Sequence, residues 1–189
     1  MNNAYIFLAD GFEEIEALAT ADVLRRGGVP VQLVSVSGQF QVTGSHGIRV
    51  VADTTFNLFC AEAEDLDTSD ALIFPGGLPG AKNLAENEEL MELMKEHYAH
   101  GGIVAAICAA PGLVVSRIPT LEGKKFTCYD GFEDAPAAKG GVYVKAPCVT
   151  DGQLITGRGP AFALPFGLAI LEKMRGADKA AEISAGLLL

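Results

Sequence analysis

Cys108 has neighbours that are typical of a nucleophile. It lies in the run Ala-Ile-Cys-Ala-Ala (residues 106–110), between an apolar stretch and a helix-forming one. A reactive atom at a sharp strand-to-helix turn needs small residues on both sides, as in the Gly-x-Ser-x-Gly elbow of hydrolases. A thiol there would face a helix N-terminus, which favours the thiolate and lowers the pKa. The alternative is a structural cysteine, because free cysteine is often buried.

Two adjacent glycines end another apolar stretch. Gly76 and Gly77 follow Pro75, directly after the apolar run 71–74. Glycine has no side chain, so backbone N–H groups at such a turn can come close to a ligand. The Gly77 N–H could therefore join the Ala109 N–H in binding an oxyanion. The alternative is a plain turn, which this motif by itself favours.

Three glutamates follow the first apolar run of the chain. Glu13, Glu14 and Glu16 come directly after Asp10-Gly11-Phe12. Carboxylates in the first turn of a helix suit the positive end of the helix dipole. Spacing alone therefore predicts a solvated acidic helix start for all three.

The spacing of the three histidines brings none of them next to Cys108. His97 and His100 precede the strand that ends at Cys108, and that strand separates His100 from the thiol by roughly 25 Å. Both are interpreted as residues of a helix surface. His46 could approach only from a hairpin, for example across a dimer. A papain-like cysteine–histidine mechanism is therefore disfavoured.

Composition excludes several classes of function. The chain has 24 Asp and Glu residues against 14 Lys and Arg, a net charge of −10, and no basic run, which disfavours binding to nucleic acids and anionic membranes. No stretch approaches the ~20 apolar residues that span a bilayer. The four cysteines form no Cys-x-x-Cys motif, so we expect no metal site and free thiols in a reducing cytoplasm.

Apolar runs and helical patterns alternate along the chain, which predicts one α/β domain over residues 1–189. Runs without polar alternation are typical of strands buried on both faces of a parallel sheet; they cover residues 4–9, 31–36, 71–74 and 103–107. Helical patterns cover residues 13–26, 90–100, 164–171 and 177–185. The expected fold is a doubly wound sandwich, with helices on both faces of a mostly parallel sheet.

The remaining strands are short. The pieces 39–43 and 48–52 predict a hairpin added to the sheet. Further strands are expected at 126–128, 142–144 and 154–156, the last two joined across Asp151-Gly152.

Four motifs, taken together, resemble the ThiJ/PfpI superfamily, most closely the branch that includes the Parkinson-disease protein deglycase. They are LADGFEEIE (8–16), FPGGLPGAKNL (74–84), AAICAAP (105–111) and ITGRGP (155–160). The resemblance extends from Ala4 to about Met174. It implies a flavodoxin-like sandwich, a single class I glutamine amidotransferase-like domain, a homodimer, and activity without a cofactor.

The resemblance also implies roles for individual residues. Cys108 would be an oxidisable nucleophile, and a protonated Glu16 would donate a hydrogen bond to its thiolate or sulfinate. Gly77 and Ala109 would supply backbone donors, and Arg158 would lie near the site.

Two further positions complete the implied site. His46 falls where relatives carry basic residues around the pocket or the dimer contact. Tyr129 occupies the position at which many relatives have a histidine, and a phenol with a reference pKa near 10 is a poor base at neutral pH. The chemistry that remains is a Cys–Glu pair with oxyanion donors, which suits addition of a thiolate to a reactive carbonyl.

Three functions stay open at this stage. The first is a glyoxalase- or deglycase-type enzyme acting on small reactive carbonyls or their adducts. The second is an oxidative-stress sensor or chaperone in which Cys108 is oxidised without turnover. The third is an intracellular peptidase or amidase, which would need a base beside Cys108.

Overall fold

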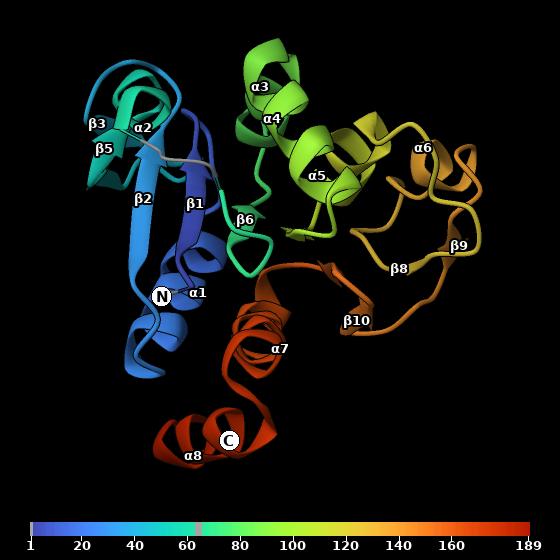
Figure 1. Ribbon diagram of the computed structural model, residues 1–189. Coiled ribbons are helices and arrows are strands. Elements are labelled where there is room, and N and C mark those ends of the chain that lie inside the picture. The colour runs from blue at the N-terminus through green and yellow to red at the C-terminus, as the bar shows by residue number, and fades with distance from the viewer. Residues whose placement is uncertain (1, 63–65) are drawn as a thin grey trace.

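The central sheet of the computed structural model runs in the order β10-β11-β7-β6-β1-β2-β5 (Figure 1). The structure describes residues 2–62 and 66–189. The strands of this sheet are β1 (Ala4–Leu8), β2 (Val31–Ser35), β5 (Thr54–Thr55), β6 (Ala71–Phe74), β7 (Ile103–Ile107), β10 (Cys148–Asp151) and β11 (Leu154–Gly157). All pairs are parallel except β10–β11. The predicted, mostly parallel sheet is confirmed.

The middle strands form the core because their sequences are apolar on both faces. Every residue of β6 and β7 is buried, as expected for strands covered by helices on each side. Phe7 of β1 stacks on Phe74 of β6 with ring centroids 5.3 Å apart. These central strands carry the site at their carboxyl ends.

The direction of the chain along the sheet reverses between β1 and β6. From β1 the chain moves to β2, whereas from β6 it moves to β7 on the other side. Right-handed crossovers then place the helices that follow β1 and β6 on opposite faces. In α/β proteins, ligands bind at the carboxyl ends of the strands where the direction reverses, which here are β1 and β6.

Helices cover both faces of the sheet, as predicted (Figure 1). One layer holds α1 (Glu14–Arg26), α7 (Ala163–Arg175) and α8 (Ala177–Gly186), in which α7 packs against both others. In the other, α3 (Gly80–Glu86) packs against α4 (Glu88–Ala99) and α5 (Ala110–Leu113). Short helices α2 (Phe56–Glu62) and α6 (Asp134–Ala137) lie in connections. No helix of the described chain is long and apolar enough to cross a membrane.

The predicted hairpin forms, but as a sheet of its own. Its strands, β3 (Gln41–Thr43) and β4 (Arg49–Val51), pair only with each other. Strand β5 occupies the edge of the main sheet beside β2, which leaves no place there for the hairpin. Thr43 instead joins the hairpin to the end of β1: its N–H donates to Asp10 Oδ1 (2.8 Å) and its carbonyl accepts from the Gly11 N–H (2.8 Å).

The prediction that strands 142–144 and 154–156 form a hairpin is wrong. The turn at Asp151-Gly152 joins β10 to β11, so the residues directly before the turn make the antiparallel pair. Residues 142–143 form β9 (Val142–Tyr143), which pairs in parallel with β8 (Lys125–Phe126) in a third, small sheet. The segment between β8 and β9 carries Asp130 and Tyr129 beside the candidate site.

Candidate active site

Cys108 occupies the sharp corner between β7 and α5. Its φ is +64°, a left-handed conformation that is costly for a residue with a side chain. Two backbone hydrogen bonds hold it: its N–H donates to the Gly157 carbonyl (3.0 Å), and its carbonyl accepts from the Tyr129 N–H (2.8 Å). The predicted strand-to-helix corner is therefore present. Cys108 is 9% exposed there.

Gly76 allows the turn after β6 to pass directly over the thiol. A Cβ added at Gly76 would lie 2.5 Å from Cys108 Cβ, 3.0 Å from Cys108 Sγ and 2.8 Å from Glu16 Oε2. Any side chain there would collide with both functional groups. The sequence predicts that the lack of a side chain at Gly77 allows close approach of the backbone. In the structure, the lack of a side chain at Gly76 makes room for Cys108 and Glu16.

Glu16 reaches the same turn from the first turn of α1. The Gly76 N–H donates to Glu16 Oε2 at 2.7 Å, and the Gly76 carbonyl accepts from the Glu13 N–H at 3.0 Å. The carboxyl group is buried, and the Cys108 thiol next to it acts to lower its pKa. Glu16 Oε1 has no hydrogen-bond partner among the described residues.

Burial makes the Glu16 carboxyl group easy to protonate. It raises the pKa of Glu16 from 4.5 to about 7, with a smaller contribution from the Glu13 charge, while the Gly76 N–H and the Cys108 thiol oppose the rise. Both protonation states are therefore populated near neutral pH, as a proton shuttle requires.

The Cys108 thiol has a raised pKa while Glu16 is ionised. Burial, followed by the Glu16 charge, raises the pKa of Cys108 to about 12, and the N–H groups of Gly77 and Ala109 oppose the rise. The predicted lowering is thus wrong for this state, because helix α5 has only one turn and a carboxylate lies beside the sulfur. The pair shares one negative charge, so a thiolate requires a neutral Glu16.

The predicted backbone donors converge on the sulfur. The backbone N–H groups of Gly77 and Ala109 both act to lower the pKa of Cys108, so they favour its anionic form. Gly77 has a φ of +85°, and a Cβ there would lie 2.5 Å from the Glu13 nitrogen. The sequence predicts Gly77 and Ala109 as donors but not the Gly76 N–H as the donor to Glu16, for which the Gly-Gly pair was the available signal.

Arg158 follows β11 and binds Asp130 rather than the thiol. Its Nη2 lies 2.7 Å and 2.9 Å from the two Asp130 carboxylate oxygens, and its Nε lies 3.2 Å from Oδ1. A pocket of about 300 Å³ is lined by Tyr129, Asp130, Arg158, Gly159, Pro160, Ala161 and Phe162. Tyr129 is half-exposed, with its ring beside Gly159. Arg158 and Tyr129 thus line one pocket, and sequence reasoning missed Asp130.

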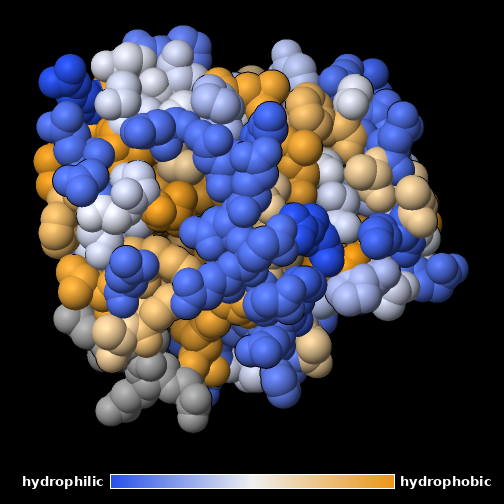
Figure 2. Space-filling view, turned by 90° about the horizontal axis from the view of Figure 1, so that it is seen from above, coloured by the Kyte–Doolittle hydropathy of each residue, from blue (hydrophilic) through white to orange (hydrophobic). Residues whose placement is uncertain are grey.

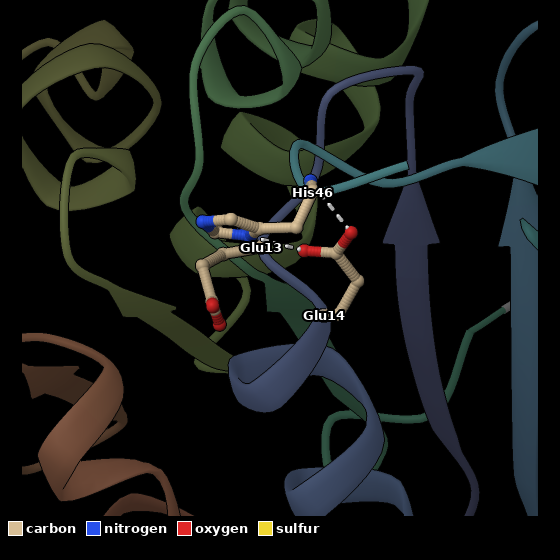
Figure 3. Close-up of side chains that lie close together, drawn as sticks. All are labelled: Glu13, Glu14 and His46. Atoms are coloured by element: carbon tan, nitrogen blue, oxygen red, sulfur yellow. Dashed lines mark hydrogen bonds and ion pairs between the residues drawn. The ribbon is translucent and has the colours of Figure 1, made fainter. Parts of the chain in front are cut away.

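The His46 side chain lies beside the Glu14 carboxylate (Figure 3). Its Nδ1 is 2.8 Å from Glu14 Oε2, and its backbone N–H donates to Glu14 Oε1 at 2.7 Å. These bonds outweigh the opposing effect of burial and lower the pKa of Glu14 to about 2. Within one chain this residue fixes the hairpin to α1, and its role at the pocket or the dimer contact remains a prediction.

The cluster of Glu13, Glu14 and His46 does not suit a metal ion. Their ligand atoms lie within 4.8 Å of one another. However, the Glu14 oxygens already accept from Ser45 Oγ, the N–H of Ile48 and two groups of His46. The Glu13 carboxylate accepts the Glu16 N–H at 2.7 Å and caps α1. The expected absence of a metal site remains a prediction.

The solvated acidic helix start predicted from spacing is wrong for all three glutamates. Glu13, Glu14 and Glu16 are buried, because the hairpin and the turn after β6 cover the first turn of α1. His97, predicted on a helix surface, is also buried and lies 3.1 Å from the Asp70 carbonyl through Nε2. Its neighbour His100 is exposed, as predicted.

Comparison with known proteins agrees with this geometry. The family model described as "DJ-1/PfpI family" matches residues 2–173. The chain belongs to the DJ-1/PfpI family. The resemblance to the ThiJ/PfpI superfamily is therefore confirmed.

Relatives within the DJ-1/PfpI family cover almost the whole chain. Protein DJ-1 homolog A of Arabidopsis thaliana is 38% identical over 96% of this chain; the chain spans only 45% of that protein. The glutathione-independent glyoxalase DJR-1.2 of Caenorhabditis elegans is 34% identical over 88% of this chain and 85% of its own length. The crystal structure of Drosophila melanogaster DJ-1beta is similar with a TM-score of 0.89 and 34% identity, covering 100% of this chain and 99% of the other.

The site of this DJ-1/PfpI protein opens at the carboxyl ends of the parallel strands. Strands β1 and β2 point upward in Figure 1, so Figure 2 looks down on these ends and shows hydrophobic areas between larger hydrophilic ones. The described residues supply a sulfur nucleophile, a carboxyl group able to give or take a proton, and two N–H donors. This combination can add a thiol to a carbonyl carbon and stabilise the oxygen that becomes negative.

Proposed function

We propose that this protein converts small α-oxoaldehydes, or the adducts they form, by a cysteine-dependent reaction that needs no cofactor. The observation that carries the proposal is the packing of Cys108 and Glu16 under the Gly76-Gly77 turn. The name of the nematode relative, a glutathione-independent glyoxalase, agrees with a reaction in which the protein's own thiol replaces glutathione.

The first chemical step is addition of the Cys108 sulfur to the aldehyde carbon of a substrate such as methylglyoxal. The Glu16 carboxylate accepts the thiol proton as the carbon–sulfur bond forms. The N–H groups of Gly77 and Ala109 stabilise the resulting oxyanion, which takes a proton to give a hemithioacetal.

The later steps move one proton between two carbons. Glu16 removes the proton from the former aldehyde carbon to give an enediol, and a proton returns to the neighbouring carbon to give a thioester. Water then hydrolyses the thioester and releases lactate and free Cys108. The balance is one methylglyoxal and one water for one lactate and one proton, and a Glu16 pKa of about 7 suits both proton transfers.

Lactate formation from methylglyoxal tests the proposal directly. We expect Cys108→Ser and Glu16→Gln each to reduce kcat/KM by about 100-fold or more. Cys128→Ser is the matched control, since it changes another buried free thiol, and it should retain activity. Equal turnover by all four proteins would exclude the reaction.

Oxidation sensing is the second candidate function, and the buried Glu16 Oε1 favours it. A protonated carboxyl group there could donate to an oxygen on the Cys108 sulfur. Two molecules of hydrogen peroxide would convert the thiolate to the sulfinate and release two waters. Mass spectrometry should then find two added oxygen atoms on Cys108 alone, while uniform oxidation of all four cysteines would contradict this function.

The peptidase or amidase hypothesis is not proposed. It needs a base at Cys108, and the three histidines are bonded elsewhere: His46 to Glu14, His97 to Asp70 and His100 to Glu96. This hypothesis would gain support only if His46 of a second copy lay close enough to Cys108 to act as the base.

We further propose that the protein forms a homodimer through α1 and the hairpin. Ile15 is 58% exposed and Leu18 is partly exposed on α1, and Ile48 of the hairpin is 56% exposed. The Ile48 N–H lies 3.4 Å from Glu14 Oε1, so these apolar side chains share one region beside the site. A reducing cytoplasm remains the prediction from the free thiols.

A further inference from the structure

Asp130 binds Arg158, the only cationic side chain among the described residues that line the pocket of about 300 Å³. The Arg158 guanidinium makes three contacts of 2.7–3.2 Å with the Asp130 carboxylate. Lys145 Nζ lies 3.5 Å from the same carboxylate. Arg158 is mostly buried, whereas Asp130 is exposed. The site residue that could attract an anion is therefore already occupied by an internal anion.

Backbone hydrogen bonds place this ion pair next to the nucleophile. Tyr129, which precedes Asp130, donates its N–H to the Cys108 carbonyl at 2.8 Å. Gly157, which precedes Arg158, accepts the Cys108 N–H at 3.0 Å. Both members of the pair thus follow residues that are bonded to the nucleophile's own backbone.

We propose that Asp130 is a specificity-determining residue that occupies Arg158 and so excludes carboxylate-bearing substrates from the Cys108 site. The substrate class that follows, neutral carbonyls such as methylglyoxal rather than anionic ones such as glyoxylate, rests on the proposed function. The effect of Asp130 on the rate at which charged reagents alkylate Cys108 does not depend on the proposed function.

The physical reason lies in the shape of the guanidinium group. Its N–H donors match a carboxylate in a bidentate pair, and Asp130 already uses that geometry through Nε and Nη2. A substrate carboxylate that binds Arg158 must first displace Asp130. It then lies beside the unpaired negative charge of Asp130. A neutral aldehyde needs neither step. Near this ion pair, the positive charges of Arg158 and Lys145 are matched by the negative charges of Asp130 and Glu133.

Two alkylating reagents of nearly equal size test this filter at the thiol itself. Iodoacetate is anionic and iodoacetamide is neutral, and both label the Cys108 thiolate. Because both reagents react with the thiolate, the ratio of their labelling rates at one pH does not depend on how much of Cys108 is ionised. We expect Asp130→Asn to raise the iodoacetate-to-iodoacetamide ratio at Cys108 about fivefold or more.

Matched variants separate a freed guanidinium from a simple change of charge. Glu133→Gln removes one negative charge from the same loop but leaves the Asp130–Arg158 pair, so it should change the ratio less than twofold. Adding Arg158→Gln to Asp130→Asn should restore the ratio of the parent protein. If Asp130→Asn fails to fold, Asp130→Ser replaces it, and we expect the same rise in the iodoacetate-to-iodoacetamide ratio.

Two results would overturn the proposal. One is an increase in Asp130→Asn no larger than in Glu133→Gln. The other is an increase that persists after Arg158→Gln is added. Turnover of glyoxylate relative to methylglyoxal should rise in Asp130→Asn; if the parent protein turns over neither substrate, the proposed function fails while the alkylation ratio still decides on the filter.

Discussion

The Glu16 carboxyl group and the Cys108 thiol lie under one glycine peptide, buried together and sharing a single negative charge. Gly76 lies against both groups: its N–H binds Glu16, and a Cβ on it would lie 3.0 Å from Cys108 Sγ. The acidity of the thiol is therefore a property of the pair. This relationship leads to measurable consequences for reactivity and for stability.

Replacing Glu16 by Gln should lower the pKa of Cys108. The charge of Glu16 is the second largest contribution to the raised pKa, and glutamine removes it while keeping the size of the side chain. The pH dependence of iodoacetamide labelling, followed at Cys108 by mass spectrometry, measures this pKa. Cys128 supplies the internal control within the same digest. A pKa that stays the same or rises in Glu16→Gln would show that the carboxylate does not oppose the thiolate.

The stability of the parent protein should fall relative to Glu16→Gln as the pH rises. The folded-state pKa of Glu16, about 7, lies above its ordinary 4.5, so its favourable contribution is complete below about pH 4.5 and is lost as the pH rises through 7. A shift of this size corresponds to about 3 kcal/mol. Urea unfolding of both proteins at pH 5 and about pH 8 checks the sign. A difference that is constant with pH would mean that Glu16 titrates normally.

Gly76→Ala should distort the site. The new methyl group would lie 2.5 Å from Cys108 Cβ and 2.8 Å from Glu16 Oε2, so strands or side chains must shift, at a cost of about 1–3 kcal/mol in unfolding free energy. Labelling of Cys108 should change in rate as well. Gly186→Ala is the control, because a Cβ there meets nothing within 4 Å and φ is not positive. Equal stability of the two variants would contradict the packing described.

Ile15→Asp should weaken self-association. The side chain of Ile15 is exposed on α1 in one chain, and a charge placed inside an apolar interface is costly to desolvate. Sedimentation of the parent protein should give a dimer, and the variant should shift toward the monomer. Val142→Asp, at another exposed apolar position, is the control. A monomeric parent protein would refute the dimer itself, and an unchanged dimer in Ile15→Asp would refute this interface.

Local patterns were sufficient for most elements of the fold. The apolar runs that form β1, β6 and β7 predict buried strands without further information, because strands buried on both faces need apolar residues throughout. Small residues around Cys108 likewise indicate a tight corner, since the sterics act on immediate neighbours. These features follow from interactions along the chain.

Errors arose where distant segments compete for the same partner. The hairpin of β3 and β4 was predicted on the main sheet, but β5 takes that edge. The strand β10 was missed because only its pairing with β11, across the turn at Asp151-Gly152, distinguishes it from a loop. Pairing energies depend on which strands are available, and periodicity does not contain that information.

The family, the central parallel strands and the sharp corner at Cys108 follow from patterns in the sequence. The chemistry at that corner depends on tertiary contacts. The burial of Glu16, its contact with Cys108 and the capture of Arg158 by Asp130 join segments far apart in the chain. The pKa of a buried group depends on its distance from other charges and from water, and those distances exist only after the sheet has brought its carboxyl ends together.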